Sequence, residues 1–238
     1  MWNTQFIIIS GFHTKAKAHI LPWILTIHQG TDPSNDISLN VELGNDDALA
    51  DLPAKLTDVI FKANRIYWHR LLQINYTTYN LRCESDAVNL HTNHCDIMLL
   101  SCADIDIDGS SQHPFCYTRV LGIFHANVIY TGPGSRDYQS RHIEFLWVWW
   151  FELLKDRPLG WQHSAFDTTR FVLMAEEDTF GFMGPGDVLR ACHLIPSFAD
   201  SLLHSDGIAV SSCTCDSGNW KHYYINRCGL YLAGSTCD

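Results

Sequence analysis

Hydrophobic and polar residues alternate most clearly over residues 117–130 of the chain. Val120 and Phe124 fall on one side of this alternation, and His125 falls on the other. Successive side chains of a β-strand point to opposite faces of the sheet, so the pattern predicts one long, half-buried strand. A similar alternation over residues 143–152 predicts a second strong strand after an intervening turn.

Shorter runs rich in β-branched and aromatic residues predict further strands at residues 58–61, 65–74, 96–100, 171–174, 188–195 and 222–225. Lys62, Ala63 and Asn64 separate the first two runs and predict the turn of a β-hairpin. Residues 13–28 fit a helix only loosely, because Pro22 would kink the helix or restart it. Many strands and little helix predict a mainly β protein with minor α, built as a small, strongly bent β-barrel or a sandwich.

The same pattern divides the chain into three parts. Residues 1–54 are expected to form a loosely ordered N-terminal segment with a short helix, because residues 31–53 are acidic and rich in turn residues. Residues 55–226 are expected to form the β-rich, barrel-like domain. Residues 227–238 are expected to be an irregular tail.

Composition places the chain among globular proteins. It has 238 residues, of which 46% are hydrophobic and 18% charged. No apolar run approaches the roughly 18 to 20 residues that span a bilayer, so we expect no membrane segment. The formal charge of -10 works against a protein that binds nucleic acid mainly by neutralising phosphates, so any direct DNA contact is expected to be local or indirect.

The chain contains nine cysteines, and its start lacks the basic and long apolar regions of a secretory signal. We therefore expect a protein that is not secreted and whose cysteines are reduced, in the nucleus or the cytosol. Such cysteines are mostly small core residues.

One acidic motif raises the question of calcium. Asp104, Asp106, Asp108 and Gly109 have the spacing that opens a calcium loop. The twelfth position, however, is Phe115 and not a bidentate carboxylate. We therefore interpret the motif as an acidic surface turn and assign no calcium.

Cysteine and histidine residues near the C-terminus could bind zinc. Cys213, Cys215, His222 and Cys228 could be combined into a zinc site, but structural zinc ligands usually come as C-x(2–4)-C pairs. No second close pair follows. We interpret these cysteines as part of an irregular tail and predict no metal.

His91, His94, Cys95 and Asp96 form a polar cluster that could pass for a metal or a Cys/His catalytic site. A histidine next to a strand start is more often a structural residue, and the common nucleophile, phosphate-loop and zinc-protease motifs are absent from the chain. We therefore predict no catalytic residue and no cofactor.

Aromatic residues supply the remaining candidate site. Tyr117, Trp147, Trp149, Trp150 and Trp161 could form an exposed surface that encloses a methylated lysine or stacks against a flat ligand. The alternative is that they belong to the core, where large aromatic residues usually lie. Alternation assigns the neighbouring tryptophans to opposite faces of one strand.

Seven segments carry a resemblance to a known family. They are Asn75-Tyr-Thr-Thr-Tyr-Asn-Leu-Arg82, Asn89-Leu-His-Thr-Asn-His-Cys-Asp-Ile-Met98, Arg119-Val-Leu-Gly-Ile-Phe-His125, Tyr130-Thr-Gly-Pro-Gly134, Glu144-Phe-Leu-Trp-Val-Trp-Trp-Phe151, Phe180-Gly-Phe182 and His193-Leu-Ile-Pro-Ser-Phe198. In this order they resemble the C-terminal region of transposon-encoded proteins of basidiomycete fungi, the Plavaka-type relatives of CACTA transposases. The resemblance implies a mobile-element origin and a nuclear setting, and it brings no catalytic residue.

A second, narrower resemblance concerns the fold. Arg119-Val-x-x-Ile123-Phe124, followed by Val148-x-Trp150-Phe151, is similar to the SH3-like barrel of bromo-adjacent-homology modules. The same segments are similar to the accessory C-terminal domain of plant CACTA transposases. These similarities imply an SH3-like, bent β-barrel and a chromatin-binding function.

The chain departs from its relatives after Tyr223-Tyr-Ile-Asn226. Relatives continue there into an ending rich in aspartate, aromatic residues and glycine, whereas a shifted reading frame would produce the ending found here. Cys228 and Cys237 would then be accidents of frame. These departures predict a decayed or truncated copy.

The function predicted from these features is a non-enzymatic interaction module, a remnant of a transposon-encoded protein. Its expected partner is a transposase or a chromatin protein. The alternative from another class is a metal-dependent nuclease or hydrolase fragment that uses Asp104, Asp106 and Asp108, although their close spacing suits one cation loop better than a two-metal centre. A third hypothesis is a decayed copy without a selected function.

Overall fold

The structure of the chain is a computed structural model. It describes residues 11–29, 52–77, 83–92, 94–101, 113–154, 167–176, 178–211, 214 and 216–226. The predicted acidic connector at residues 31–53 lies outside the described residues except for Leu52 and Pro53, which begin a helix, and the predicted tail at residues 227–238 lies outside them entirely.

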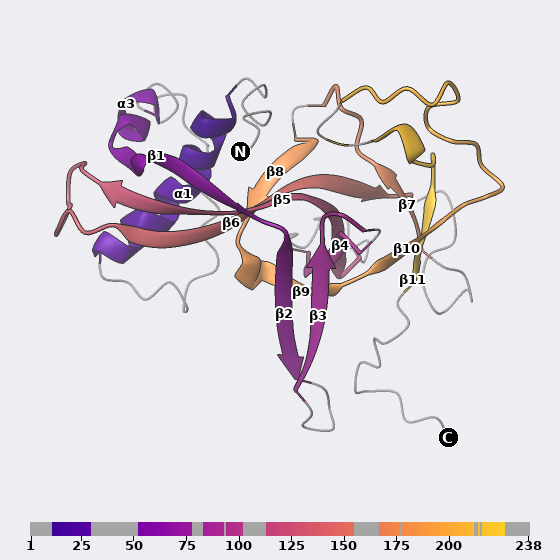
Figure 1. The fold of residues 1–238 in the computed structure, drawn as a ribbon, viewed down its shortest axis with the longest axis horizontal. Helices are drawn as coiled ribbons and strands as arrows, with labels where there is room; N and C mark the ends of the chain where they lie inside the picture. Colours follow the sequence, from indigo (N-terminus) through magenta and orange to yellow (C-terminus); the bar gives the residue numbers. More distant parts are fainter. Residues whose placement is uncertain are drawn as a thin grey trace, which may run out of the picture. The chain divides into compact units, whose positions relative to one another are not determined.

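Strands dominate the described residues, which confirms the mainly β class with minor α (Figure 1). The helices are α1 (Phe12–Gln29) and α3 (Leu52–Thr57), and the 3-10 turns are η3 (Pro185–Asp187) and η4 (Asp216–Gly218). The strands are β1 (Val59–His69), β2 (Leu71–Thr77), β3 (Cys83–Asn89), β4 (Asp96–Leu100), β5 (Phe115–Tyr130), β6 (Arg141–Leu153), β7 (Thr168–Phe171), β8 (Phe180–Met183), β9 (Val188–Ala191), β10 (His193–Pro196) and β11 (Tyr223–Asn226). The two long alternations of the sequence correspond to β5 and β6.

Backbone contacts group the chain into two compact units. The first comprises Met1–Trp68 and Phe124–Phe145, and the second comprises His69–Ile123 and Leu146–Asp238. The long strands β5 and β6 supply residues to both units. The sequence predicted a boundary at residue 54 between an N-terminal segment and the β-rich domain. The contacts instead group α1 and α3 with parts of β1, β5 and β6 in one unit.

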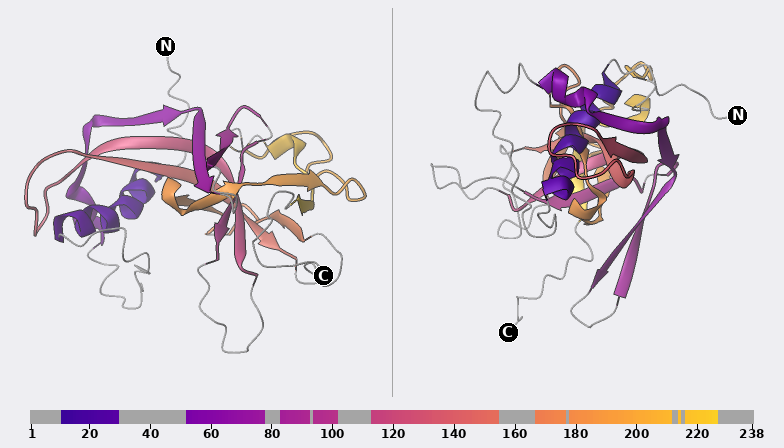
Figure 2. Two further views of the ribbon diagram at one scale, coloured as in Figure 1. Left: turned by 90° about the horizontal axis from the view of Figure 1, so that it is seen from below. Right: turned by 90° about the vertical axis from the view of Figure 1, so that its left-hand side faces the viewer.

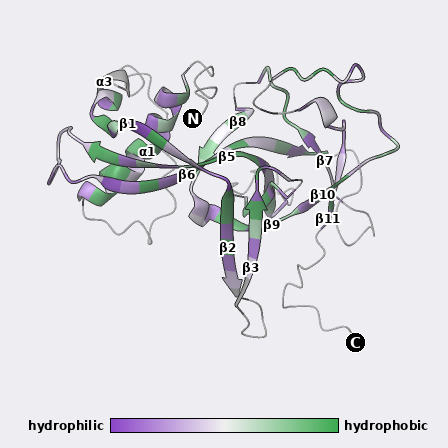
Figure 3. Ribbon diagram, in the orientation of Figure 1, coloured by the Kyte–Doolittle hydropathy of each residue, from purple (hydrophilic) through white to green (hydrophobic). Residues whose placement is uncertain are grey.

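In the first unit, α1 lies against strands β1, β5 and β6. Ala16, Ile20 and Ile24 recur every four residues and are fully buried, so they form one face of the helix. The ring of Phe12 meets that of Phe124 in β5 at a centroid distance of 5.5 Å. The buried strand residues of this unit are Val59, Phe61, Phe124, Ala126, Val128, Tyr130, Ile143 and Phe145. Figure 3 shows the corresponding alternation of hydrophobic and hydrophilic positions along these strands.

Helix α1 is one continuous helix of 18 residues, so the break predicted at Pro22 does not occur. Proline removes one backbone donor from a helix, which is why the sequence predicted a kink. The burial of Ile20 and Ile24 on either side of Pro22 holds the helix against the strands instead. No helix in the described part of the chain is long and apolar enough to cross a membrane.

In the second unit, hydrogen-bonded strands follow the order β10-β11-β7-β6-β5-β4-β9, and β8 pairs with β6 beside this path. Strands β9 and β10 lie at opposite ends of the path but are consecutive in the chain, with Cys192 between them. The amide of Cys192 donates to the carbonyl oxygen of Asp96 in β4 at 2.9 Å. The described strands form no closed barrel. In place of the predicted barrel, the strands form an open path, and the chain connects its two end strands, β9 and β10, through Cys192.

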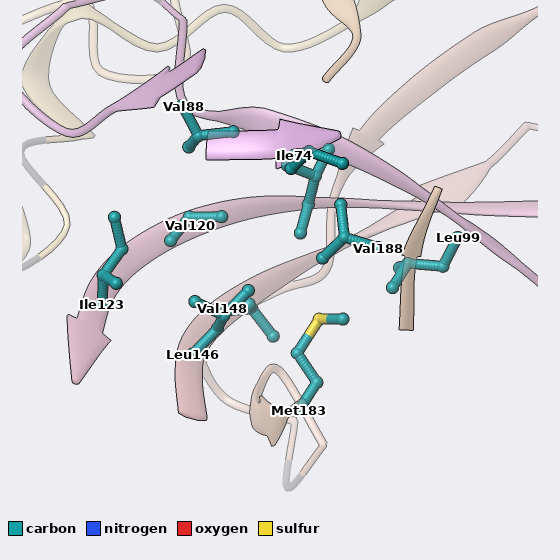
Figure 4. Close-up of a cluster of buried hydrophobic side chains, with 10 residues drawn as sticks. Ile74, Val88, Leu99, Val120, Ile123, Leu146, Val148, Met183 and Val188 are labelled. Carbon is teal, nitrogen blue, oxygen red and sulfur yellow. The ribbon is translucent and has the colours of Figure 1, made fainter. Parts of the chain in front are cut away.

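Two hydrophobic clusters form the core of the second unit, and β6 contributes to both. One cluster contains Ile74, Val88, Ile97, Leu99, Val120, Ile123, Leu146, Val148, Met183 and Val188 (Figure 4). The other contains Met98, Tyr117, Trp149, Phe151, Phe171, Leu194, Tyr223 and Ile225. Alternate residues of β6 thus enter different clusters, as its sequence pattern predicts. Both faces of this part of β6 are buried, because one of the two hydrophobic clusters packs against each face.

The hairpin predicted from residues 58–61 and 65–74 is wrong. Ala63 and Asn64 do adopt left-handed backbone, with φ of 56° and 53°, but they lie inside the continuous strand β1. Strand β1 pairs with β5. The sequence correctly predicted turn-like backbone at these residues. The chain does not reverse there, because the residues on both sides belong to one strand that pairs with β5.

Strands β2 and β3 form a separate two-stranded antiparallel sheet in the second unit (Figure 2). Arg190 of β9 joins it: its Nε lies 3.3 Å from Asp86 Oδ2, and its Nη2 donates to the hydroxyl of Tyr76 at 2.8 Å. The Asp86 carboxylate also accepts a bond from the amide of Ala191 at 3.1 Å. These bonds attach the ribbon to β9.

Candidate functional site

The second unit contains a pocket of about 360 Å³. Its walls come from β6, from β7 and the residues after it, and from residues 203–222. The lining residues are Trp149, Arg170, Phe171, Val172, Leu173, Met174, Leu203, His204, Val210, Trp220, Lys221 and His222. A site of this size lies within the range that holds small ligands or single side chains, roughly 300 to 1,000 Å³.

The floor of this pocket is aromatic. Trp149 and Phe171 are buried and stack with their ring centroids 4.0 Å apart. The indole N–H of Trp149 donates to the carbonyl oxygen of Val172 at 3.0 Å, so its one polar group is satisfied within the protein. The remaining ring surface is apolar and suits an apolar group better than a polar one.

Exposed apolar residues border the pocket. Leu173 is 56% exposed and Val210 is 70% exposed. Phe198, which is 72% exposed, packs edge-on against the pocket residue Trp220 with ring centroids 5.1 Å apart. Large apolar side chains gathered on a surface mark interaction sites more often than isolated ones do.

Basic residues also line the pocket: Arg170, Lys221, His204 and His222. The guanidinium of Arg170 is paired with the carboxylate of Glu152. The side-chain amine of Lys221 makes no ion pair with any residue that the structure describes. The pocket therefore combines an apolar floor with a rim on which Lys221 is the cation that has no ion-pair partner among the described residues.

Each pocket histidine lies beside an aspartate. His204 Nε2 is 2.8 Å from Asp216 Oδ2, and His222 Nδ1 is 3.0 Å from Asp200 Oδ2. Asp216 is fully buried, whereas the side chain of Asp200 is 26% exposed. Each carboxylate thus flanks its imidazole on the pocket wall, although neither of these imidazole nitrogens makes a hydrogen bond to a described residue in this arrangement.

Asp216 also organises the segment that carries Val210. Its carboxylate accepts bonds from the amides of Val210 and Ser211, each at 3.2 Å, and from the hydroxyl of Thr214 at 2.8 Å. Burial opposes the charge of Asp216, but these hydrogen bonds outweigh it and hold the pKa of the carboxyl below its ordinary value. One buried carboxylate thus holds the pocket wall in place.

Ser197, Asp200 and His222 have the composition of a hydrolytic triad but a different order. The hydroxyl of Ser197 donates to Asp200 Oδ2 at 2.6 Å, and the same oxygen faces His222. In a triad the histidine lies between serine and aspartate, so that it can take the proton of the serine. Here the carboxylate of Asp200 lies between them, so the hydroxyl of Ser197 contacts a carboxylate and not the imidazole of His222.

A partly buried arginine, whose side chain is 18% exposed, supports the pocket floor. The guanidinium of Arg119 lies 4.8 Å from the ring centroid of Phe171, and its Nη1 donates to Asn219 Oδ1 at 3.0 Å. Phe171 is therefore in contact with both this cation and Trp149. Cation–π attraction and stacking together fix the orientation of the ring.

The predicted polar cluster of His91, His94, Cys95 and Asp96 does not form one site. His91 and His94 are exposed, whereas Asp96 is buried and accepts two bonds from Arg119. Burial, followed by the charge of Asp96, raises the pKa of the Cys95 thiol to about 11. A thiol with such a pKa is protonated near neutral pH and is a poor nucleophile.

The structure corrects the prediction of an exposed aromatic surface. Tyr117, Trp147 and Trp149 are only 1%, 3% and 1% exposed, and Trp150 is half-buried. The tryptophans lie on β6, both faces of which are covered, and Tyr117 of β5 packs in the same cluster as Trp149. Trp161 lies outside the described residues. Of the predicted set, Trp149 alone among the described residues lines the pocket.

Two predicted alternatives for metal binding fall largely outside the described residues. Asp104, Asp106 and Asp108 belong to the segment that the structure does not describe, and so do Cys213 and Cys215. Within the described residues, no group of three or more histidine, cysteine, aspartate or glutamate side chains is arranged to hold a metal ion.

Apart from Trp149 and His222, the residues that line this pocket were not singled out by sequence reasoning. Arg170 and Phe171 come from a short strand, and their meeting with Trp220 and Lys221 depends on strand pairing. One local signal was present: an aromatic residue followed by two basic residues, Trp220-Lys221-His222.

Comparisons with known proteins find no match for the chain among family models, curated proteins or solved structures.

Proposed function

We propose that this protein is a non-enzymatic interaction module, a remnant of a transposon-encoded protein of the Plavaka type. Its partner is a transposase or a chromatin protein, and its setting is the nucleus. The ordered series of sequence motifs supports the origin. The pocket over Trp149, Phe171 and Trp220 supports a binding role.

The observation that carries the binding role is the meeting of an aromatic floor and a basic rim in one pocket. A large apolar side chain of a partner would be removed from water against Trp149 and Phe171, which stabilises the complex by about 1.5–3 kcal/mol. An acidic residue beside it would meet Lys221 and Arg170. The pocket therefore suits a protein segment with a large apolar residue next to aspartate or glutamate.

The same basic rim argues against a methylated lysine as the ligand. A cage for such a group offers open aromatic faces and no competing cations. Here the ammonium group of Lys221 lines the pocket, and like charges repel. An acidic segment is the better match.

The test is a binding survey with the full chain. Fluorescence polarisation would compare peptides that carry tryptophan, phenylalanine or leucine next to acidic residues with the same peptides bearing lysines. We expect the acidic peptides to bind and the basic peptides to fail. A well-folded protein that binds none of the acidic peptides would contradict the proposal.

A matched pair of variants locates the binding. Val210→Glu places a negative charge at the rim, where Val210 is 70% exposed, so it should weaken the binding of acidic peptides by about tenfold. Leu100→Glu makes the same kind of change at a residue that is 60% exposed and does not line the pocket, and it should leave binding unchanged. Equal effects of the two variants would show that the peptides bind elsewhere.

A further inference from the structure

Three rings lie in a row on neighbouring strands of the first unit: the first two are stacked, and the third is tilted. The ring of Tyr67 in β1 lies parallel to that of His125 in β5, with centroids 4.6 Å apart and planes at 7°. The ring of His125 in turn meets that of His142 in β6 at 4.5 Å. The row therefore crosses three strands in the order Tyr67, His125, His142.

This row lies on the face of the strands that points away from α1. His125 follows Phe124, whose ring contacts the helix residue Phe12, and successive strand residues face opposite ways. Tyr67 is 41% exposed, and the side chain of His142 is 53% exposed. Among the described strands β1 pairs with β5 alone, so no strand lies beside the outer ring face of Tyr67.

The strand that carries Tyr67 is basic. Lys62 and Arg65 are exposed, and neither makes an ion pair with a described residue. Strand β1 contains no acidic side chain, in a chain whose formal charge is -10. At the far end of the row, Glu144 Oε1 lies 3.4 Å from His142 Nε2. The exposed cations without an ion pair to a described residue lie instead on the strand that carries Tyr67, at the other end of the row.

We propose that this face of the first unit binds single-stranded nucleic acid. An unpaired base stacks on the outer ring face of Tyr67 and continues the row, while adjacent phosphates lie against Arg65 and Lys62. Base stacking on exposed aromatic residues combined with cations along one strand is the general way in which proteins hold single strands without reading their sequence. None of the residues of this site lines the pocket, so an experiment on this site tests the present proposal and not the proposed function.

A single strand fits this face better than a duplex. The bases of a duplex are already stacked and paired, so they cannot cover the ring of Tyr67 without being turned out. The number of free cations is also small, and phosphate contacts alone would not overcome the net negative charge of the chain. Stacking has to supply part of the affinity.

The experiment uses the full chain and fluorescence anisotropy at low salt. Three labelled 12-mers are compared: thymidine DNA, an abasic strand with the same phosphates, and a duplex. We expect the thymidine strand to bind at least about tenfold more tightly than the abasic strand and the duplex. Equal affinity for the abasic strand, tighter binding of the duplex, or no binding at all would overturn the proposal.

Variants then assign the contacts. Tyr67→Ala should weaken binding of the thymidine strand by about 5- to 100-fold, whereas Tyr67→Phe should keep it. Tyr138→Ala, at a residue that is 72% exposed on the turn between β5 and β6, is the matched control and should have no effect. Arg65→Gln should lower the slope of log affinity against log salt by about 0.7. Thermal unfolding of each variant shows whether it is folded, and a folded Tyr67→Ala variant that binds like the parent would overturn the proposal.

Discussion

Arg119 and Asp96 form a bidentate ion pair inside the second unit: Nε donates to Oδ1 at 2.7 Å and Nη2 to Oδ2 at 3.0 Å. The side chain of Asp96 is 3% exposed. Burial opposes the charge of Arg119, but the adjacent carboxylate raises the pKa of the guanidinium above its ordinary value. The guanidinium therefore stays charged, and the pair links β4 and β5 to Phe171 beneath the pocket.

Asp96→Asn should destabilise the protein by about 3–5 kcal/mol, because it leaves the Arg119 guanidinium buried without its counter-charge. Urea unfolding measures the loss. The control is Asp137→Asn, which breaks a pair with Arg141 whose side chains are both 34% exposed. That variant should lose at most about 1 kcal/mol, and equal losses would contradict the role given to the buried pair.

His19 should make stability depend on pH. Burial lowers the pKa of His19 from an ordinary value of 6.5 to about 4. Between these values the unfolded chain binds more protons than the folded protein, so stability falls as the pH drops from 6.5 toward 4. The slope from this one group is at most about 1.4 kcal/mol per pH unit.

His19→Gln should flatten this part of the stability profile, measured by urea unfolding across the same pH range. His142→Gln, at a side chain that is 53% exposed, is the control and should leave the slope unchanged. A parent protein whose stability does not change across the range would show that His19 is protonated in the folded state.

The thiols of Cys95 and Cys192 should react slowly with alkylating reagents. Burial is the main cause that raises both pKa values, to about 11 for Cys95 and well above the ordinary value for Cys192, and the charge of Asp96 adds to it. Near pH 8 the folded protein should therefore alkylate at Cys95 about 100-fold more slowly than the urea-unfolded chain. Mass spectrometry of the modified peptides gives both rates, and similar rates in the two states would contradict the burial of these thiols.

Asp216→Asn should loosen the pocket wall and lower stability by about 2 kcal/mol, because charge-assisted bonds to Thr214, Ser211 and Val210 become weaker. The pKa of Asp216 is held below its ordinary value of 3.8, so its contribution is fully present above that pH and is lost as the pH falls through the lower, folded value. The variant should therefore be less sensitive to acid than the parent. Acid titrations followed by tryptophan fluorescence compare the two, and identical acid transitions would exclude this role for Asp216.

Several strands could be predicted because their signals are local. The alternation over residues 117–130 predicted β5, and the apolar run over residues 96–100 predicted β4. Strand β3 (Cys83–Asn89) escaped prediction because acidic residues such as Asp86 are rare in strands. It is stabilised by β2 and by Arg190, which lies 104 positions from Asp86 along the chain.

The candidate sites likewise depend on contacts between residues that are far apart in the sequence. Trp149 and Phe171 meet because β6 pairs with β7, and Tyr67 meets His125 because β1 pairs with β5 and not with β2. A periodic pattern states which residues share a face of a strand, but it does not state which strand lies beside it. For this reason the exposed aromatic surface expected on β6 is core.

The sequence by itself determined the mainly β class, the two long strands with their alternating faces, the net negative charge and the turn conformation at Ala63 and Asn64. Only the tertiary structure decided which strands are neighbours, which aromatic rings are buried, and where Lys62, Arg65 and Lys221 are left without a partner among the described residues. The physical reason is that alternation and turn chemistry act between residues close in the chain. Pockets, ion pairs and stacked rings instead form between residues that only the pairing of distant strands brings together.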